Sequence, residues 1–206
     1  QKYAIYMSVG AKTDVNTIKE ETILSVIRIS VENSVMREQL IYNSEHDMLT
    51  GLYNRRGFLE FTQKAITDSI NRGKRAMVCY ADMDNLKMVN DLYGHDDGDF
   101  AIREIASILT DTFRSTDVIG RLGGDEFVVF AVVGTDISVE AIKNRISHIT
   151  KAHNERAGKP YPIEMSTGIC EFVCSDDTDI FALLEQADEK LYMEKNLKKA
   201  QNGSYR

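Results

Sequence analysis

The sequence lacks an excess of basic residues. Its 25 lysines and arginines face 32 acidic residues, which gives a net charge of −7 at pH 7. Because nucleic-acid backbones require basic surfaces, this balance argues against nucleic acid as a partner. It does not argue against a small phosphorylated ligand, whose charge can be met by a divalent ion and a few lysines.

Long apolar runs and paired cysteines are lacking as well. No stretch reaches the length of a transmembrane span and no signal peptide is visible, so we expect this part of the protein to be cytoplasmic. The chain reads as a fragment, and the full-length protein could be anchored upstream. The three cysteines, Cys79, Cys170 and Cys174, are odd in number and show no zinc-ligand spacing. We interpret them as thiols in a reducing compartment, with Cys79 inside a buried strand.

The most informative feature present is a pair of acids directly after a pair of glycines. The run Gly123-Gly124-Asp125-Glu126 lies between strand-like segments at 117–122 and 127–133. A Gly-Gly pair predicts a hairpin with a type I′ turn, because both central residues of that turn need positive φ. The hairpin would hold both acids at the rim of a sheet, where hard oxygen ligands suit Mg²⁺. The alternative is a solvated acidic turn.

A second acidic cluster follows the apolar run 75–81, which reads as a buried strand. Asp82 and Asp84 come at its end and would share one face if the extended form persists, because side chains alternate along a strand. An EF-hand loop is excluded, since Leu86 and Lys87 stand where an oxygen ligand and a glycine belong. Two acidic clusters at strand ends therefore predict a metal-assisted phosphoryl-transfer site.

Further motifs follow one another in a fixed order. Residues 47–56 read D-x-L-T-G-L-x-N-R-R, residues 82–87 approach D-x-D-x-F-K, and residues 90–99 read N-D-x-x-G-H-x-x-G-D. Residues 114–117 read R-x-x-D, and residues 187–195 approach A-D-x-A-L-Y-x-A-K. Together they cover roughly residues 44–199, and the chain resembles the GGDEF domain family of diguanylate cyclases. It departs from the family pattern at Leu86 (usually Phe), Glu194 (commonly Ala) and Lys199 (where an Arg is expected).

The resemblance implies an enzyme that joins two GTP molecules into cyclic di-GMP and releases two pyrophosphates. It implies two divalent ions per active site, Mg²⁺ or Mn²⁺. Their ligands would be Asp82, the main-chain carbonyl of Met83, Asp125 and Glu126. Asp125 and Glu126 would also be the catalytic residues, with Asp125 helping to remove the proton of the attacking 3′-hydroxyl unless the metal suffices to activate it.

The resemblance also implies three sets of nucleotide contacts. Guanine would be read by Asn90 and Asp99, because a carboxylate accepts from guanine N1–H and the exocyclic amine. The phosphates would be bound by Asn85, Leu86, Lys87, Lys195 and Lys199, the first three through backbone N–H groups. Arg114 and Asp117 stand at the position of the family's inhibitory product site. Elsewhere such an Arg-x-x-Asp pair is usually a surface salt bridge of little energetic weight.

Alternating helical and strand-like patterns predict an α/β fold, an α+β sandwich with helices packed on a sheet. We expect helices at about 54–71 and 98–113, after a cap at Ser138, and from about 179. Strands are expected at 76–81, in the hairpin and within 162–173. The resemblance implies a mixed, mainly antiparallel central sheet flanked by helices, of the type shared by nucleotidyl cyclases and polymerase palm domains.

Residues 1–43 read as the end of an upstream sensor domain and a signalling helix, ahead of a GGDEF domain at 44–206. A short strand at 3–10 and a long helix from a cap at Asp14 towards Asn43 resemble the end of a GAF-type sensor. The helix carries an apolar stripe of Leu24, Ile27, Val31 and Val35. This stripe packs either on its own domain or on a second chain, and we favour the second because an apolar helix this wide must be covered. The resemblance also implies a homodimer, because one domain holds one GTP. The alternatives to a cyclase are a catalytically silent GTP or cyclic di-GMP receptor and a dimerising interaction module.

Overall fold

The computed structural model describes residues 15–70, 74–134 and 137–203. The chain divides into two compact units, residues 1–42 and 43–206. The first described element, helix α1 (Val15–Glu45), belongs mainly to the first unit. The predicted strand at 3–10 and the predicted cap at Asp14 lie outside the described residues.

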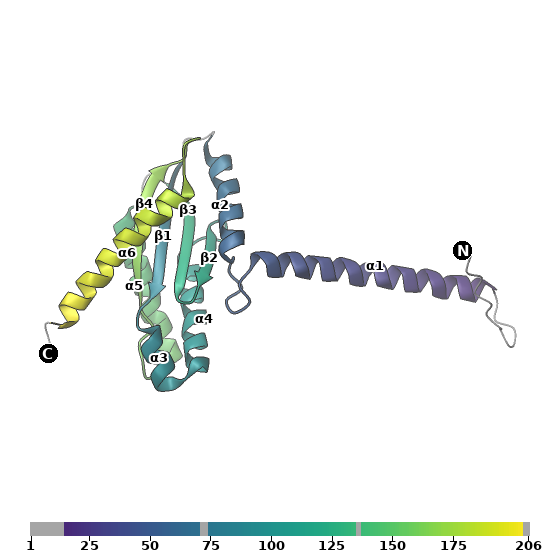
Figure 1. The fold of residues 1–206 in the computed structure, drawn as a ribbon, viewed down its shortest axis with the longest axis horizontal. Coiled ribbons are helices and arrows are strands. Elements are labelled where there is room, and N and C mark those ends of the chain that lie inside the picture. Colours follow the sequence, from purple (N-terminus) through teal and green to yellow (C-terminus); the bar gives the residue numbers. More distant parts are fainter. Residues whose placement is uncertain (1–14, 71–73, 135–136, 204–206) are drawn as a thin grey trace, which may run out of the picture. The chain divides into compact units, whose positions relative to one another are not determined.

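The second unit is built on one four-stranded sheet (Figure 1). Its strands are β1 (Arg75–Met83), β2 (Val118–Gly123), β3 (Glu126–Val133) and β4 (Met165–Val173), in the spatial order β2-β3-β1-β4. Its helices are α2 (Arg55–Ile70), α3 (Leu86–Tyr93), α4 (His95–Thr112), α5 (Val139–Ala157) and α6 (Ile180–Gly203). All three strand pairings are antiparallel; parallel pairing within the described ranges is confined to an isolated bridge between Tyr53 and Gly120.

Helices cover both faces of this sheet, which gives a three-layer α+β sandwich as predicted. Met77, Cys79 and Ala81 of β1 pack with α4 and α5 in one core cluster. The alternate residues Val78 and Tyr80 pack with α2 and α6 in the other. Because β1 is central and buried on both faces, its sequence is continuously apolar rather than alternating. The next even-numbered residue along β1 is Asp82, so this acid faces the α2 and α6 side.

The starts of α2, α5 and α6 agree with the predicted positions, whereas those of α3 and α4 do not. Asn54 accepts from Gly57 N–H and Ser138 accepts from Ala141 N–H, as expected of caps. The short helix α3 was not predicted, and α4 begins at His95 instead of at about residue 98. Gly94, with φ 92°, separates the two helices, and the sequence pattern does not show that turns of helix flank this glycine on both sides.

Helix α1 carries its apolar stripe on the surface of the chain. Leu24, Ile27, Val31 and Val35 are each more than half exposed. An apolar stripe of this length is costly to leave in water. No helix in the described ranges combines the length and the apolar character that crossing a bilayer requires.

Candidate active site

The end of β1 and the β2–β3 turn bring three of the predicted acids together. Asp82 lies opposite Glu126 in the β1–β3 register. Beside this pair, the N–H of Met83 donates to the carbonyl of Asp125 at 3.1 Å. Antiparallel pairing of β1 with β3 thus places residues more than forty positions apart at the same edge of the sheet. The sequence showed two acidic clusters, and the strand register is what joins them.

The electrostatic environment of Asp82 is that of a carboxylate crowded by other acids. Burial raises its pKa most, a hydrogen bond from Lys195 opposes that rise, and the nearby charge of Asp125 raises the pKa further. A divalent cation at this edge would relieve both the burial cost and the repulsion. Burial likewise raises the pKa of Tyr80, with Glu126 as the next contributor, so the Tyr80 hydroxyl stays neutral beside that acid.

The glycine pair shapes the hairpin differently from the expectation. The two turn residues are Gly124 and Asp125, while Gly123 ends β2 next to an irregularity in the strand register. Gly124 has φ 53°, but Asp125 lacks the positive φ that a type I′ turn requires, so that turn type was a wrong prediction. The extra residue in β2 shifts the turn by one position, and Asp125 rather than a second glycine occupies its tip.

A side chain that the sequence did not single out fixes this turn. Arg121 donates through Nη1 to both carboxylate oxygens of Asp47, at 3.0 and 3.1 Å, and through Nε and Nη2 to the carbonyl of Gly124, at 3.0 and 2.8 Å. Burial alone would raise the pKa of Asp47, but hydrogen bonds from Thr50 and Arg121 outweigh it and the pKa is lowered. Through Arg121, Asp47 of the opening motif at 47–56 is therefore linked to the acidic turn. This contact joins residues far apart in the sequence, so the sequence did not predict it.

Lysines of α6 face the two strand-end acids of β1. Lys195 Nζ lies 2.6 Å from Asp82 Oδ1, and Lys198 Nζ lies 2.7 Å from Asp84 Oδ2. Asp84 also accepts from Ser166 Oγ at 2.8 Å. The predicted common face required the extended backbone to continue, but β1 ends at Met83 and Asp84 lies in the following turn. Each of the two acids nevertheless contacts a lysine of α6, and these lysines are three positions apart. Lys199, predicted to bind phosphate, is exposed. The ion pair with Asp84 is made instead by its neighbour Lys198, which the sequence did not single out.

The segment predicted to cradle phosphates leads into α3. Asn85 has φ 61°, the one positive φ found among the described non-glycine residues, and Leu86 begins the helix. The first intrahelical bond of this end runs from Val89 N–H to the Asn85 carbonyl. The N–H groups of the preceding residues, Leu86 and Lys87 among them, are the end-of-helix donors that have no partner within the helix.

Close packing between α3 and α4 places the side chain of Asn90 against the residue that precedes Asp99. A Cβ on Gly98 would lie 1.9 Å from Asn90 Oδ1, so the side chain of Asn90 lies directly against the backbone next to Asp99. Only glycine permits this approach. Asn90 is half-buried and Asp99 is exposed, which leaves the carboxylate of Asp99 accessible to a ligand.

Arg114 and Asp117 form a tight backbone turn between α4 and β2. Arg114 N–H donates to Asp117 Oδ2 at 2.8 Å, and Asp117 N–H donates to the Arg114 carbonyl at 2.9 Å. Burial raises the pKa of Asp117 although the bond from Arg114 opposes the rise. The Arg114 side chain is exposed, and Arg145 of α5 lies near enough for its charge to lower the pKa of Asp117.

The site matches a divalent cation in donor chemistry but is not closed around one. Asp82 and Lys195 line a cavity of about 540 Å³, together with Asp188, Glu189, Leu191, Tyr192 and Met193. A larger hollow of about 900 Å³, between α5, α6 and β4, contains Lys198 but none of the predicted metal ligands. No group of three or more His, Cys, Asp or Glu in the described part of the chain is already gathered for a metal. The predicted carboxylate ligands are of the type that Mg²⁺ prefers. In this structure the ammonium group of Lys195 neutralises part of their negative charge by pairing with Asp82.

Comparisons with known proteins agree with these features. The sequence profile of the family described as "Diguanylate cyclase, GGDEF domain" matches residues 44–201. The chain is 34% identical over 161 residues to the diguanylate cyclase DgcP of Escherichia coli K12, covering 77% of this chain and 47% of DgcP. It is 32% identical over 201 residues to the probable diguanylate cyclase DgcE of the same strain, covering 94% of this chain and 18% of DgcE. The chain thus spans about half or less of these relatives.

A solved structure shares the fold. The coiled coil and GGDEF domain of DgcB from Caulobacter crescentus, solved in complex with c-di-GMP, superposes with a TM-score of 0.69. The alignment covers 85% of this chain and 94% of the DgcB chain, at 24% identity. The DgcB structure shows the shared fold, and the sequence match over residues 44–201 shows that the chain belongs to the diguanylate cyclase family, as a GGDEF domain.

Proposed function

We propose that residues 44–206 form a diguanylate cyclase domain that condenses two GTP molecules into cyclic di-GMP. The observation that carries this proposal is the meeting of Asp82, Asp125 and Glu126 at one edge of the sheet. Acids gathered at a strand edge beside lysines supply both a site for a divalent cation and positive charge for phosphates.

The divalent ions, Mg²⁺ or Mn²⁺ and two per site, would be held by Asp82, the Met83 carbonyl, Asp125 and Glu126. When bound, they supply charge stabilisation for the attacking oxygen and the phosphate. Asp125 takes up the proton of the 3′-hydroxyl of one GTP. That oxygen forms a bond to the α-phosphorus of the other GTP, the bond from this phosphorus to the bridging oxygen breaks, and pyrophosphate leaves. The same exchange in the reverse direction closes the ring.

The remaining predicted contacts orient the nucleotide. Asn90 and Asp99 bind the guanine edge, and the backbone N–H groups of Asn85, Leu86 and Lys87 bind the phosphates. Lys195 and Lys199 meet the terminal phosphates. For Lys195 this requires exchange of its present partner, Asp82, for phosphate oxygens when the cation takes over the carboxylate.

The reaction needs two domains, because one domain positions one GTP. We infer that the protein acts as a homodimer in which the exposed apolar stripe of α1 packs against the same helix of a second chain. An upstream sensor would then control activity through the placement of the two domains. Cyclic di-GMP bound at Arg114 and Asp117, with Arg145 nearby, would hold the domains apart and lower activity.

The test is nucleotide turnover by the purified chain. GTP and Mg²⁺ are incubated with the wild type and with Asp125→Ala, and the products are separated by chromatography. Cyclic di-GMP from the wild type alone supports the proposal. Intact GTP at high protein concentration, together with cyclic di-GMP binding that is lost in Arg114→Ala, would replace it with the silent receptor.

A further inference from the structure

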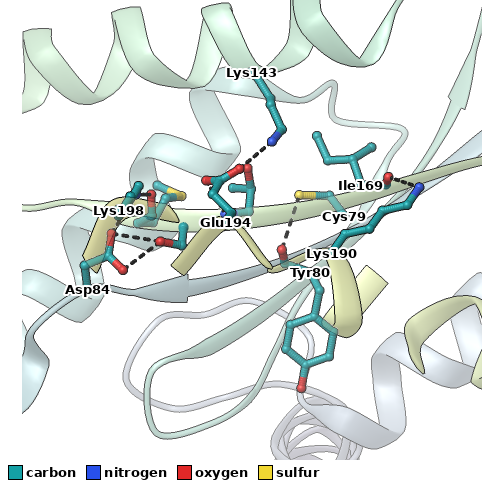
Figure 2. Close-up of polar contacts among 11 residues, drawn as sticks. Cys79, Tyr80, Asp84, Lys143, Ile169, Lys190, Glu194 and Lys198 are labelled. Carbon is teal, nitrogen blue, oxygen red and sulfur yellow. Dashed lines mark hydrogen bonds and ion pairs between the residues drawn. The ribbon is translucent and has the colours of Figure 1, made fainter. Parts of the chain in front are cut away.

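Helix α6 covers the outer edge of β4 with a regular set of polar side chains. Lys190 Nζ donates to the Ile169 carbonyl at 2.9 Å and Lys198 Nζ donates to the Met165 carbonyl at 2.8 Å (Figure 2). Between them, Glu194 Oε1 accepts from the Thr167 N–H at 3.0 Å. The strand groups recur every second residue and the helix side chains every fourth. One face of the helix therefore hydrogen-bonds to three backbone groups along one edge of the strand. We call Lys190, Glu194 and Lys198 the α6 clasp.

The helix lies directly against the strand at this point. A Cβ on Gly168 would meet the Ala187 carbonyl at 1.9 Å and the Leu191 N–H nitrogen at 2.4 Å, so no side chain separates β4 from α6. Ala187 and Leu191 are themselves buried. The part of α6 up to Leu191 is thus held against β4 by packing. The part beyond Leu191, which carries Lys195 and Lys198, depends on polar contacts.

Glu194 is the member of the clasp that joins three elements. One carboxylate oxygen accepts from β4, and the other is ion-paired with Lys143 of α5 (Figure 2). The motif that residues 187–195 approach has alanine at positions 190 and 194, and a methyl group cannot reach the strand edge. Two of the three clasp residues, Lys190 and Glu194, are therefore departures of this chain from that motif.

The residues beside Glu194 are the ones that face the acids of β1. Lys195 is next in sequence and contacts Asp82, and Lys198 is one turn further and contacts Asp84. Long lysine side chains lose considerable rotamer freedom when they are held at a ligand, so a fixed helix backbone matters for their binding. A helix end that rotated or moved away from β4 would carry both ammonium groups away from the site.

We propose that Glu194 is a positioning residue for the triphosphate: by locking the C-terminal half of α6 to β4 and α5, it holds Lys195 where the terminal phosphates of GTP bind. This rests on the proposed function, which assigns those phosphates to Lys195. The charge of Glu194 acts in the opposite direction, since a carboxylate next to a phosphate site repels the ligand. When Glu194 is removed, a positioning role therefore predicts weaker GTP binding, whereas loss of the carboxylate charge alone predicts tighter GTP binding.

The experiment measures binding separately from turnover. The full chain is titrated calorimetrically, in Mg²⁺, with an α,β-methylene analogue of GTP that cannot release pyrophosphate. The variants are Glu194→Ala, Glu194→Gln, and the control Glu171→Ala, which removes the ion pair between β4 and Arg75 at the other end of the strand. Hydrogen exchange of the Thr167 amide and GTP initial rates are recorded for each variant.

We expect Glu194→Ala to weaken analogue binding about tenfold, the equivalent of about 1.4 kcal/mol, and to raise the KM for GTP similarly with kcat within about twofold. Glu194→Gln keeps an acceptor for the Thr167 N–H but loses the charge, so its affinity for the analogue should lie between those of Glu194→Ala and the wild type. The Thr167 amide should exchange faster in Glu194→Ala, and Glu171→Ala should bind as the wild type does.

Unchanged or tighter binding in Glu194→Ala, with faster Thr167 exchange, overturns the positioning role and leaves Glu194 as a cover for the sheet edge. If Glu194→Ala does not fold, Glu194→Gln and Lys143→Ala decide the same question, since unaltered binding in both overturns the proposal. A wild type that binds the analogue without turning over GTP contradicts the cyclase but not the positioning role. A wild type that binds no analogue overturns both.

Discussion

Replacing Arg121 by methionine tests how the opening motif supports the acidic turn. Methionine keeps much of the apolar stem and removes the guanidinium, which bonds both oxygens of Asp47 and the carbonyl of Gly124. The side chains of Arg121 and Asp47 are only 11% and 24% exposed. Each buried group left without a partner costs about 1–3 kcal/mol, so we expect the free energy of unfolding to fall by about 3 kcal/mol. At about 2–4 °C per kcal/mol for a domain of this size, the melting temperature should fall by about 6–12 °C.

Urea unfolding of the full chain, followed by circular dichroism, measures this loss. The matched control is Arg75→Met, which breaks the more exposed pair with Glu171 and should cost less than about 1 kcal/mol. Arg121→Lys keeps the charge but loses the planar fork, and should recover only part of the stability. If Arg121→Met unfolds within about 0.5 kcal/mol of the wild type, the pair is not what holds the turn.

The same variant has a defined pH dependence. The pKa of Asp47 is lowered in the folded chain, from an ordinary value of 3.8. A carboxylate of this kind stabilises the fold above its unfolded pKa, and that contribution disappears as pH falls through the folded pKa. Removal of Arg121 makes this lowering of the Asp47 pKa smaller. The stability difference between wild type and Arg121→Met should therefore be full at neutral pH and narrow below about pH 4. A difference that is constant with pH would show that charge on Asp47 is not involved.

Three further perturbations address other parts of the site. Gly98→Ala places a methyl group against Asn90 Oδ1. The KM for GTP, measured from initial rates, should therefore rise by about tenfold or more with a smaller effect on kcat. An unchanged KM would contradict the predicted guanine contact. Arg114→Ala should raise the concentration of cyclic di-GMP needed for half-inhibition by about tenfold, while inhibition like that of the wild type would remove Arg114 from the product site. Burial raises the pKa of the Cys79 thiol to about 12, so iodoacetamide at about pH 8 should leave Cys79 unlabelled in the folded chain and label it in urea, and mass spectrometry that finds native labelling would refute its burial.

The sequence predicted the sandwich because local patterns carry that information, whereas the mainly antiparallel sheet was implied by the resemblance to a known family. The continuous apolar run of β1 indicates a strand covered on both faces, and Asn54 and Ser138 act as helix caps through contacts three residues away. The division between α3 and α4 could not be predicted in the same way. It depends on Gly94 at φ 92° and on the packing of Asn90 against Gly98, which is a contact between helices rather than a local preference.

By itself the sequence determined that acids follow the apolar run of β1 and the glycine pair of the hairpin, because apolar runs and glycine turns are local patterns. Tertiary structure alone decided their partners. Strand register set Asp82 opposite Glu126, and the packing of α6 on Gly168 brought Lys195 and Lys198 to the acids of β1. The contacts of Asp82 and Asp84 with the lysines of α6 join residues more than a hundred positions apart. Their geometry follows from how helices and strands pack, and no spacing within a single motif records it.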